Sequence, residues 1–195
     1  MAARRIAVIV GHPDPAPGRL CRQMAQAYAA GAAEAGHAVR IIDVALIDIP
    51  HLRTKADFET GSGQGDIAAA QETLAWAEHW LVVYPLWLGA MPALLKAFFE
   101  QVCRPGFAFR YRDKGFPEKL LAGRTAHVVV TMGMPAFAYR WFYFAHSLAA
   151  LKRNILAFVG VKAVRDTLVG MVDRLDAVKI AALMARMREA GAAAR

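Results

Sequence analysis

The chain has 195 residues, of which 57% are hydrophobic and 21% are charged. A chain this long and this apolar can bury a large core, which excludes intrinsic disorder as its main state and favours a single domain over residues 1–195. Lysine and arginine outnumber aspartate and glutamate by 24 to 16, giving a net charge of +8. The basic residues are scattered, so they indicate a solvated surface or a phosphate-bearing ligand, and they form no nucleic-acid-binding motif.

The N-terminal sequence and the cysteine content predict a cytoplasmic protein. The apolar run Ile6–Gly11 is too short for a signal peptide. The longest uncharged stretch, Trp80–Leu95, is broken by two prolines and a glycine, so it predicts no membrane-spanning helix. Cys21 and Cys103 form no C-x-x-C pair and are too few for a disulfide framework, and each is predicted to be a small buried hydrophobe.

Short β-branched runs alternate with helical patterns along the whole chain. The predicted strands are residues 5–11, 38–44, 80–87, 125–133 and 161–170. The predicted helices are residues 17–35, 67–79, 92–102, part of 135–160, and 174–190, with Asp66 as the N-cap of the second. Residues 45–65 and 103–123 are predicted loops. Five strands that alternate with five helices predict an α/β fold with a parallel sheet, doubly wound so that helices cover both faces.

Three loops follow the carboxyl ends of the first, third and fourth predicted strands: residues 11–19, 85–91 and 131–139. Ligands of doubly wound sheets bind at this edge, so we expect the three loops to form one site. The first loop leads into a helix whose unpaired amides favour an anion, although it lacks the Gly-Lys-Ser/Thr of a P-loop. No dinucleotide-binding G-x-G-x-x-G is present, and the Gly-x-Gly at Gly61 and Gly63 follows no strand and predicts a turn.

Other residue patterns carry weaker signals. His37, His51, His79 and His127 have no metal-ligand spacing, and no His/Cys/carboxylate cluster predicts a zinc or iron site. The aromatic run Trp141–Phe144 fits a core segment together with a dimer surface, or a lid over a substrate.

The most informative segment is Tyr84–Val102, in which a strand runs into Pro85 and then presents Trp87 and Leu88 before a glycine turn. Backbone groups beside an apolar wall suit a flat aromatic cofactor. The pattern Pro-Leu-x-x-Gly-x-Pro-Ala-x-x-Lys resembles the signature of flavin-dependent NAD(P)H:quinone reductases with the flavodoxin-like fold, a group that includes ancillary subunits of bacterial potassium-efflux systems. The motifs His-Pro, GFAFRY, DKGF and Thr-x-Gly match in the same order, so the resemblance covers residues 5–170.

The resemblance implies a three-layer flavodoxin-like fold with the strand order 2-1-3-4-5, and it assigns roles to particular residues. The flavin phosphate would be held by His12, Ala16, Pro17, Gly18 and Arg19. The isoalloxazine would be lined by Pro85, Leu86, Trp87, Leu88, Thr131, Met132, Gly133 and Met134. Tyr139 and His146 would be catalytic, and Phe109 and Tyr111 would reach across a homodimer interface to the other protomer's substrate pocket.

The resemblance also implies that hydride passes from NADH or NADPH through FMN or FAD to a quinone, in two half-reactions at one shared site. The chain departs from the family in the first loop, where Ala16–Arg19 lack the usual hydroxyl donors, and at Met134, where a second glycine is usual. Two alternatives stay open: a non-enzymatic electron carrier of the flavodoxin type, and a regulatory subunit docked at a membrane on a transporter. The positive charge disfavours the electron carrier, because such carriers are usually acidic.

Overall fold

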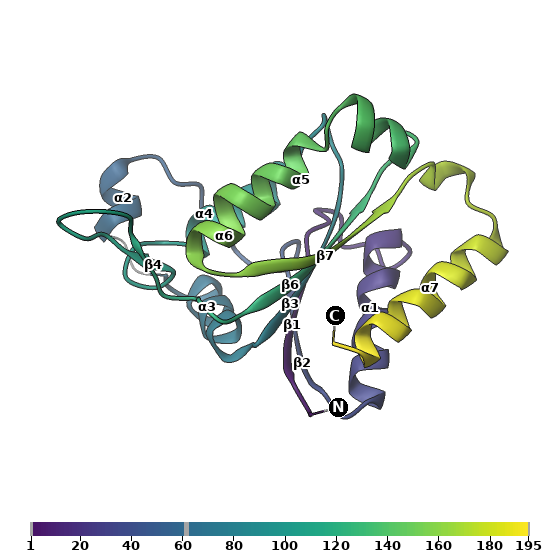
Figure 1. The fold of residues 1–195 in the computed structure, drawn as a ribbon, viewed down its shortest axis with the longest axis horizontal. Coiled ribbons are helices and arrows are strands. Elements are labelled where there is room, and N and C mark those ends of the chain that lie inside the picture. Colours follow the sequence, from purple (N-terminus) through teal and green to yellow (C-terminus); the bar gives the residue numbers. More distant parts are fainter. Residues whose placement is uncertain (1, 61–62, 195) are drawn as a thin grey trace.

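The computed structural model describes residues 2–60 and 63–194, so Gly61 of the predicted glycine turn lies outside the described residues. A sheet of five parallel strands in the order β2-β1-β3-β6-β7 forms the centre and confirms the predicted order 2-1-3-4-5 (Figure 1). The strands are β1 (Arg5–Val10), β2 (Ala38–Asp43), β3 (His79–Pro85), β6 (Thr125–Thr131) and β7 (Lys162–Val169). Every residue of β3 is buried, as expected for the central strand of a parallel sheet.

Helices cover both faces of this sheet and make three layers (Figure 1). Successive residues of each strand alternate between the two helical layers. One layer consists of α1 (Leu20–Glu34) and α7 (Ala177–Ala192), the latter preceded by the 3₁₀ turn η3 (Val172–Arg174). The other layer consists of α3 (Asp66–Trp76), α4 (Ala93–Val102), α5 (His146–Ala150) and α6 (Ala157–Val159).

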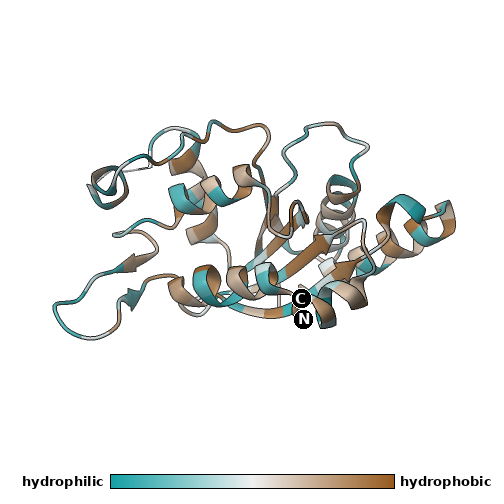
Figure 2. Ribbon diagram, turned by 90° about the horizontal axis from the view of Figure 1, so that it is seen from above, coloured by the Kyte–Doolittle hydropathy of each residue, from teal (hydrophilic) through white to brown (hydrophobic). Residues whose placement is uncertain are grey.

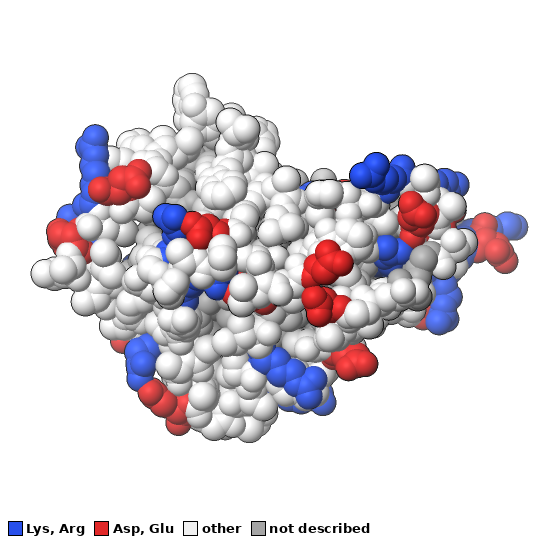
Figure 3. Space-filling view, turned by 180° about the vertical axis from the view of Figure 1, so that it is seen from behind, with Lys and Arg blue, Asp and Glu red and all other residues white. Residues whose placement is uncertain are grey.

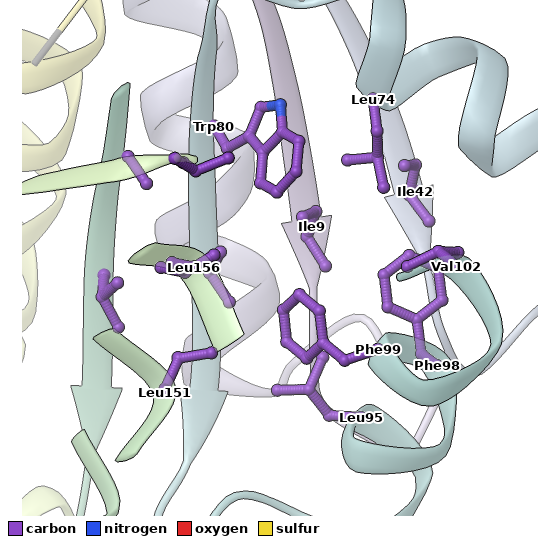
Figure 4. Packing of buried hydrophobic residues seen from close by; sticks show 14 of the residues in the cluster. Ile9, Ile42, Leu74, Trp80, Leu95, Phe98, Phe99, Val102, Leu151 and Leu156 are labelled. Carbon is purple, nitrogen blue, oxygen red and sulfur yellow. The ribbon is translucent and has the colours of Figure 1, made fainter. Parts of the chain in front are cut away.

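Apolar residues gather between the layers. Figure 4 shows Trp80 and Ile9 of the sheet packed with Leu74, Leu95 and Phe99 from the helices. In Figure 2 the strands are mostly hydrophobic, whereas the polar residues lie on the outer sides of the helices and in the loops. Within the described part of the chain, no helix combines the length and the hydropathy that crossing a bilayer requires.

Two glycines let α1 and α7 approach closely. A Cβ atom at Gly31 would lie 2.1 Å from the backbone oxygen of Arg188, and one at Gly191 would lie 2.0 Å from that of Tyr28. Any larger residue at either position would force the two helices apart. An ion pair between Arg188 and Glu34 joins the same helices at the surface. α7 therefore fixes the position of α1 and of the loop that precedes it.

The two predicted loops contain short elements that the sequence pattern did not indicate. Residues 45–65 include α2 (Lys55–Thr60), and residues 103–123 include an antiparallel hairpin of β4 (Phe109–Arg110) and β5 (Glu118–Lys119). Elements of two to six residues are too short to show a periodic hydrophobic pattern. α1 begins at Leu20, three residues later than predicted, because the residue before it, Arg19, has an extended backbone.

Two predictions about helices were wrong. Asp66 is the first residue of α3 and not its N-cap: Gly65 occupies the cap with φ of +54°, and the Asp66 carboxylate accepts a hydrogen bond from the amide of Asp48 (2.8 Å). The long helix expected within residues 135–160 is divided by Phe144 and Ala145, whose φ angles of +51° and +47° no right-handed helix accommodates. Its parts are the π-helix η1 (Ala138–Phe142), α5, the π-helix η2 (Leu151–Leu156) and α6.

Candidate active site

The three loops meet at the carboxyl edge of the sheet because main-chain pairing continues past the ends of β1 and β3. The amide of Gly11 donates to the carbonyl of Val83 (2.7 Å), and the amide of Leu86 donates to the carbonyl of Thr131 (2.7 Å). These hydrogen bonds extend the pairing of the strands into the three loops and so fix the positions of the loops relative to one another. The structure thus brings together the segments that the sequence predicted would share a site.

Side chains add further contacts between the loops. The ring of His12 meets that of Trp87 edge-on, with 5.7 Å between centroids. The Cys21 thiol at the start of α1 lies 3.3 Å from the hydroxyl of Thr131. Burial raises the pKa of Cys21 to about 11, so the thiol stays protonated at neutral pH and is a packing group, not a nucleophile.

Asp14 organises the first loop. Its carboxylate accepts hydrogen bonds from the amide of Ala16 (2.8 Å) and from Nε of Arg19 (2.7 Å), and its own amide donates to Nδ1 of His12 (3.0 Å). The bonds from Ala16 and then Arg19 lower the pKa of Asp14. Burial, followed by the charge of Arg19, lowers the pKa of His12, so this ring is neutral at pH 7 and Nδ1 can accept.

Arg22 anchors this loop to the sheet, a role that the sequence analysis missed. Its Nε donates to the carbonyl of Asp14 (2.9 Å), and its two terminal nitrogens form a bidentate ion pair with Asp43 at the end of β2. Both side chains of the pair are nearly buried. Removing one partner of such a buried pair typically costs about 3–5 kcal/mol.

The N-terminus of α1 offers donors suited to a phosphate group. The first amides of this 15-residue helix, from Leu20 and Cys21, have no carbonyl partner within the helix and point out of its positive end. The space beside Gly18 is open, because a Cβ atom placed there meets no atom within 4 Å. Arg19 is half exposed and pairs with Asp14, so its guanidinium would have to leave that carboxylate, or share it, to contact a bound anion. The amides and this cation together fit a phosphate without the hydroxyl donors usual in the family.

The second loop is a strained tight turn. The amides and carbonyls of Trp87 and Ala90 pair in both directions at 2.9 Å, and the two residues between them, Leu88 and Gly89, have φ of +46° and +75°. Glycine adopts this conformation freely, whereas a leucine held there costs about 1–2 kcal/mol. The Leu88 side chain is fully exposed and Trp87 is half exposed. The turn thus holds apolar surface at the edge of the sheet.

An apolar cavity of about 350 Å³ lies between the second and third loops. Two phenol rings and one imidazole are its only polar side chains. Such a lining suits a flat aromatic molecule held by few polar contacts. The lining residues are Leu86, Leu88, Gly89, Met134, Tyr139, Tyr143 and His146.

Of the predicted flavin contacts that do not line this cavity, Pro85, Thr131 and Met132 are buried and Gly133 is exposed. Met134 lines the cavity where the family usually has glycine, so its flexible thioether is part of the wall.

Tyr139 contacts the cavity through its ring, while its hydroxyl is bound inside its own chain. The hydroxyl lies 2.7 Å from Oγ of Ser147 and accepts a hydrogen bond from the amide of Leu148 (3.1 Å). These contacts fix the start of α5, whose first residue, His146, is exposed at the cavity. Ser147 and Leu148 are further site residues that the sequence did not indicate, since they lie eight and nine residues away from Tyr139.

The two hairpin aromatics have different environments. The Phe109 ring is buried, with 4.8 Å between its centroid and that of Phe158 and 6.3 Å to that of Phe58. Tyr111 packs edge-on against Phe109 at 5.2 Å and remains more than half exposed. The structure therefore leaves Tyr111, but not Phe109, free to contact another molecule.

Two titratable side chains away from these loops, His79 and Cys103, belong to the packed core. In the described residues, no group of three or more His, Cys, Asp or Glu side chains could hold a metal ion. Burial, followed by the neighbouring His127, lowers the pKa of His79 to about 4, so its buried ring is neutral, with Nδ1 2.7 Å from the Thr125 hydroxyl. Burial raises the pKa of Cys103 to about 12.

A family model described as flavodoxin-like fold matches residues 4–191. This chain belongs to that flavodoxin-like family. An FMN-dependent NADH:quinone oxidoreductase of Nitratidesulfovibrio vulgaris is 30% identical over 154 residues, which cover 70% of this chain and 71% of that protein. An FMN-dependent NADH:quinone oxidoreductase of Listeria innocua is 30% identical over 142 residues, which cover 67% of this chain and 66% of that protein.

Solved flavodoxin-like structures share the fold. The NAD(P)H:quinone oxidoreductase of Methanothermobacter marburgensis superposes with a TM-score of 0.78 at 24% identity, over 98% of this chain and 96% of that one. An FMN-dependent NADH-azoreductase of Bacillus anthracis, solved with FMN, superposes with a TM-score of 0.77 at 16% identity, over 97% of this chain and 98% of that one. The predicted resemblance to flavodoxin-like quinone reductases is confirmed.

We expect Arg19→Ala to weaken the binding of a phosphate-bearing ligand, for which FMN is the probe, about tenfold or more, because a charge-assisted contact to phosphate contributes about 1.5–3 kcal/mol. Quenching of flavin fluorescence gives the dissociation constants. Arg186→Ala, which removes an exposed arginine from α7, is the control and should bind FMN as the unmodified chain does. Equal FMN affinity in the two variants would show that Arg19 does not reach the phosphate.

Proposed function

We propose that the protein is an FMN-dependent NADH:quinone oxidoreductase. The observation that carries this proposal is the apolar cavity beside the turn of Trp87–Ala90, on the same sheet edge as the amide-rich start of α1. One end of that edge fits a phosphate and the other fits a flat ring system. FMN has both parts, a phosphate at one end and the isoalloxazine ring at the other. The names of the relatives support FMN over FAD and NADH as the reductant.

The residues present fit FMN in a specific orientation. The start of α1 would bind the phosphate through its amides and Arg19, with His12, Ala16, Pro17 and Gly18 forming the loop around it. The isoalloxazine would lie against the second and third loops, with contacts from Pro85, Leu86, Trp87, Leu88, Thr131, Met132, Gly133 and Met134. FMN bound there supplies the chemistry, accepting a hydride from NADH and delivering it to the quinone.

The chain itself orients the substrate and moves the proton. The balanced reaction is quinone + NADH + H⁺ → hydroquinone + NAD⁺, so one proton must reach a quinone oxygen. His146 is exposed at the cavity and is the group we assign to this proton transfer. Tyr139 accepts a hydrogen bond from the amide of Leu148 through its hydroxyl, which holds His146 in place while the largely buried ring forms part of the cavity wall.

NADH and the quinone would each bind at the same place beside the bound flavin, because both exchange a hydride with it. NAD⁺ must therefore leave before the quinone enters. Purified protein loaded with FMN should oxidise NADH rapidly only when a quinone is present, with parallel lines in double-reciprocal plots that vary both substrates. A flavoprotein that oxidises no NADH under these conditions would instead be an electron carrier of the flavodoxin type.

We further propose that two copies of the chain form a homodimer in which the hairpin of one protomer covers the cavity of the other. The support is the exposure of Tyr111 and Phe116 on a hairpin that is otherwise braced internally, by Arg110 and Arg112 around Glu118. Large exposed aromatics with arginines are typical of interfaces.

Light scattering should accordingly give twice the mass of the chain. Tyr111→Ala should raise KM for the quinone severalfold and leave the FMN dissociation constant unchanged, since FMN rests on its own chain. Ile41→Ala, at an exposed apolar residue of β2, is the matched control. A monomer with full quinone reductase activity contradicts the proposed dimer.

A further inference from the structure

A cluster of exposed aromatic side chains, which we call the aromatic ridge, lies on η1 and on the residues just before and after it. The ridge comprises Phe137, Trp141, Phe142, Tyr143 and Phe144, each between 50% and 75% exposed. The projection at the top of Figure 3, which lies over this segment, shows no Lys, Arg, Asp or Glu. Contiguous apolar surface of this kind marks a binding site in most water-soluble proteins.

The backbone holds these side chains outward in a disfavoured conformation. η1 is a π-helical turn, and Phe144 and Ala145 after it are both left-handed. Leu88, on the opposite wall of the cavity, is left-handed as well and fully exposed. Strained non-glycine residues cluster where function requires a geometry that packing alone would not select.

The ridge is continuous with the cavity. Tyr143 and His146 line the cavity, and each contacts a ridge residue: the centroids of Phe142 and Tyr143 are 5.1 Å apart, and those of Phe144 and His146 are 5.8 Å apart. Arg140, the one charged residue between Phe137 and His146, binds Asp166 on β7 (2.6 Å). An apolar path with no unpaired charge therefore leads from the cavity to the outer surface.

We propose that the aromatic ridge binds the apolar tail of a lipid-soluble quinone whose head group lies beside the bound flavin at the cavity. This inference rests on the proposed quinone reductase activity and names the class of quinone. The ridge presents aromatic rings and no unpaired cation that could bind an anionic ligand. Its occupant must therefore be apolar. A ligand that fills both surfaces must join a flat head group to an apolar chain, as a tailed quinone does.

The test compares two quinones with the same head group, 2,3-dimethoxy-5-methyl-1,4-benzoquinone, with and without a ten-carbon alkyl tail at position 6. With FMN-loaded protein, kcat/KM should be about tenfold or more higher for the tailed quinone, since a few buried methylenes suffice for that preference. In the double variant Phe142→Gln/Phe144→Asn the ratio should fall to about one. Asparagine tolerates the left-handed backbone at position 144, so this variant preserves the local fold.

Binding provides a second readout that does not depend on turnover. Without NADH, the quenching of tryptophan fluorescence should give a dissociation constant for the tailed quinone that rises about tenfold in the ridge variant, while that for the untailed quinone stays constant. Leu46→Gln/Val178→Gln, which replaces two exposed apolar residues elsewhere, is the matched control and should retain the preference for the tail.

Each other outcome overturns the proposal in a recognisable way. An unchanged preference in the ridge variant means that the tail binds elsewhere. A ridge variant that becomes a monomer by light scattering and loses affinity for both quinones equally means that a second copy of the chain covers the ridge. Reduction of both quinones at equal rates by the unmodified protein refutes the tail site and leaves the quinone reductase activity intact, whereas reduction of neither refutes the proposed function itself.

Discussion

Parallel pairing among β1, β3 and β6 is the constraint on which the site depends. The pairing continues into the loops through Gly11 and Val83 and through Leu86 and Thr131, so the loops inherit the register of the sheet. Arg22 then ties the first loop to the end of β2 through a nearly buried ion pair. The end that fits a phosphate and the apolar end are thus held at a fixed separation by main-chain pairing and by the Arg22–Asp43 ion pair.

Strain and exposed apolar surface coincide around the cavity. Leu88, Phe144 and Ala145 all adopt the left-handed conformation, and two of the three present large apolar side chains to solvent. Each of these features lowers the free energy of unfolding, and so the stability, relative to a glycine or a polar residue at the same position. Strain and exposed apolar surface at one edge are typical of a binding site.

The β-branched runs predicted the strands and the three converging loops, because they are local signals. The sheet order followed from the family resemblance that the motif around Pro85 carries. The sequence did not predict the hairpin of Phe109 and Glu118, which is too short for periodicity, or the break at Phe144, which depends on backbone angles that a run of aromatics does not encode. Arg22 pairs with Asp43 on the second strand, and Ser147 contacts the Tyr139 hydroxyl across the break at Phe144. Contacts of that kind follow from tertiary packing, which no local pattern specifies.

The central claim is that one edge of the sheet binds one FMN. The most direct measurement is the absorption spectrum of the purified protein, followed by titration with FMN and identification of the released flavin by mass. The structure predicts flavin bands near those of free FMN, a stoichiometry of one FMN per chain and micromolar or tighter affinity. A colourless protein that binds neither FMN nor FAD at micromolar concentration would contradict the account.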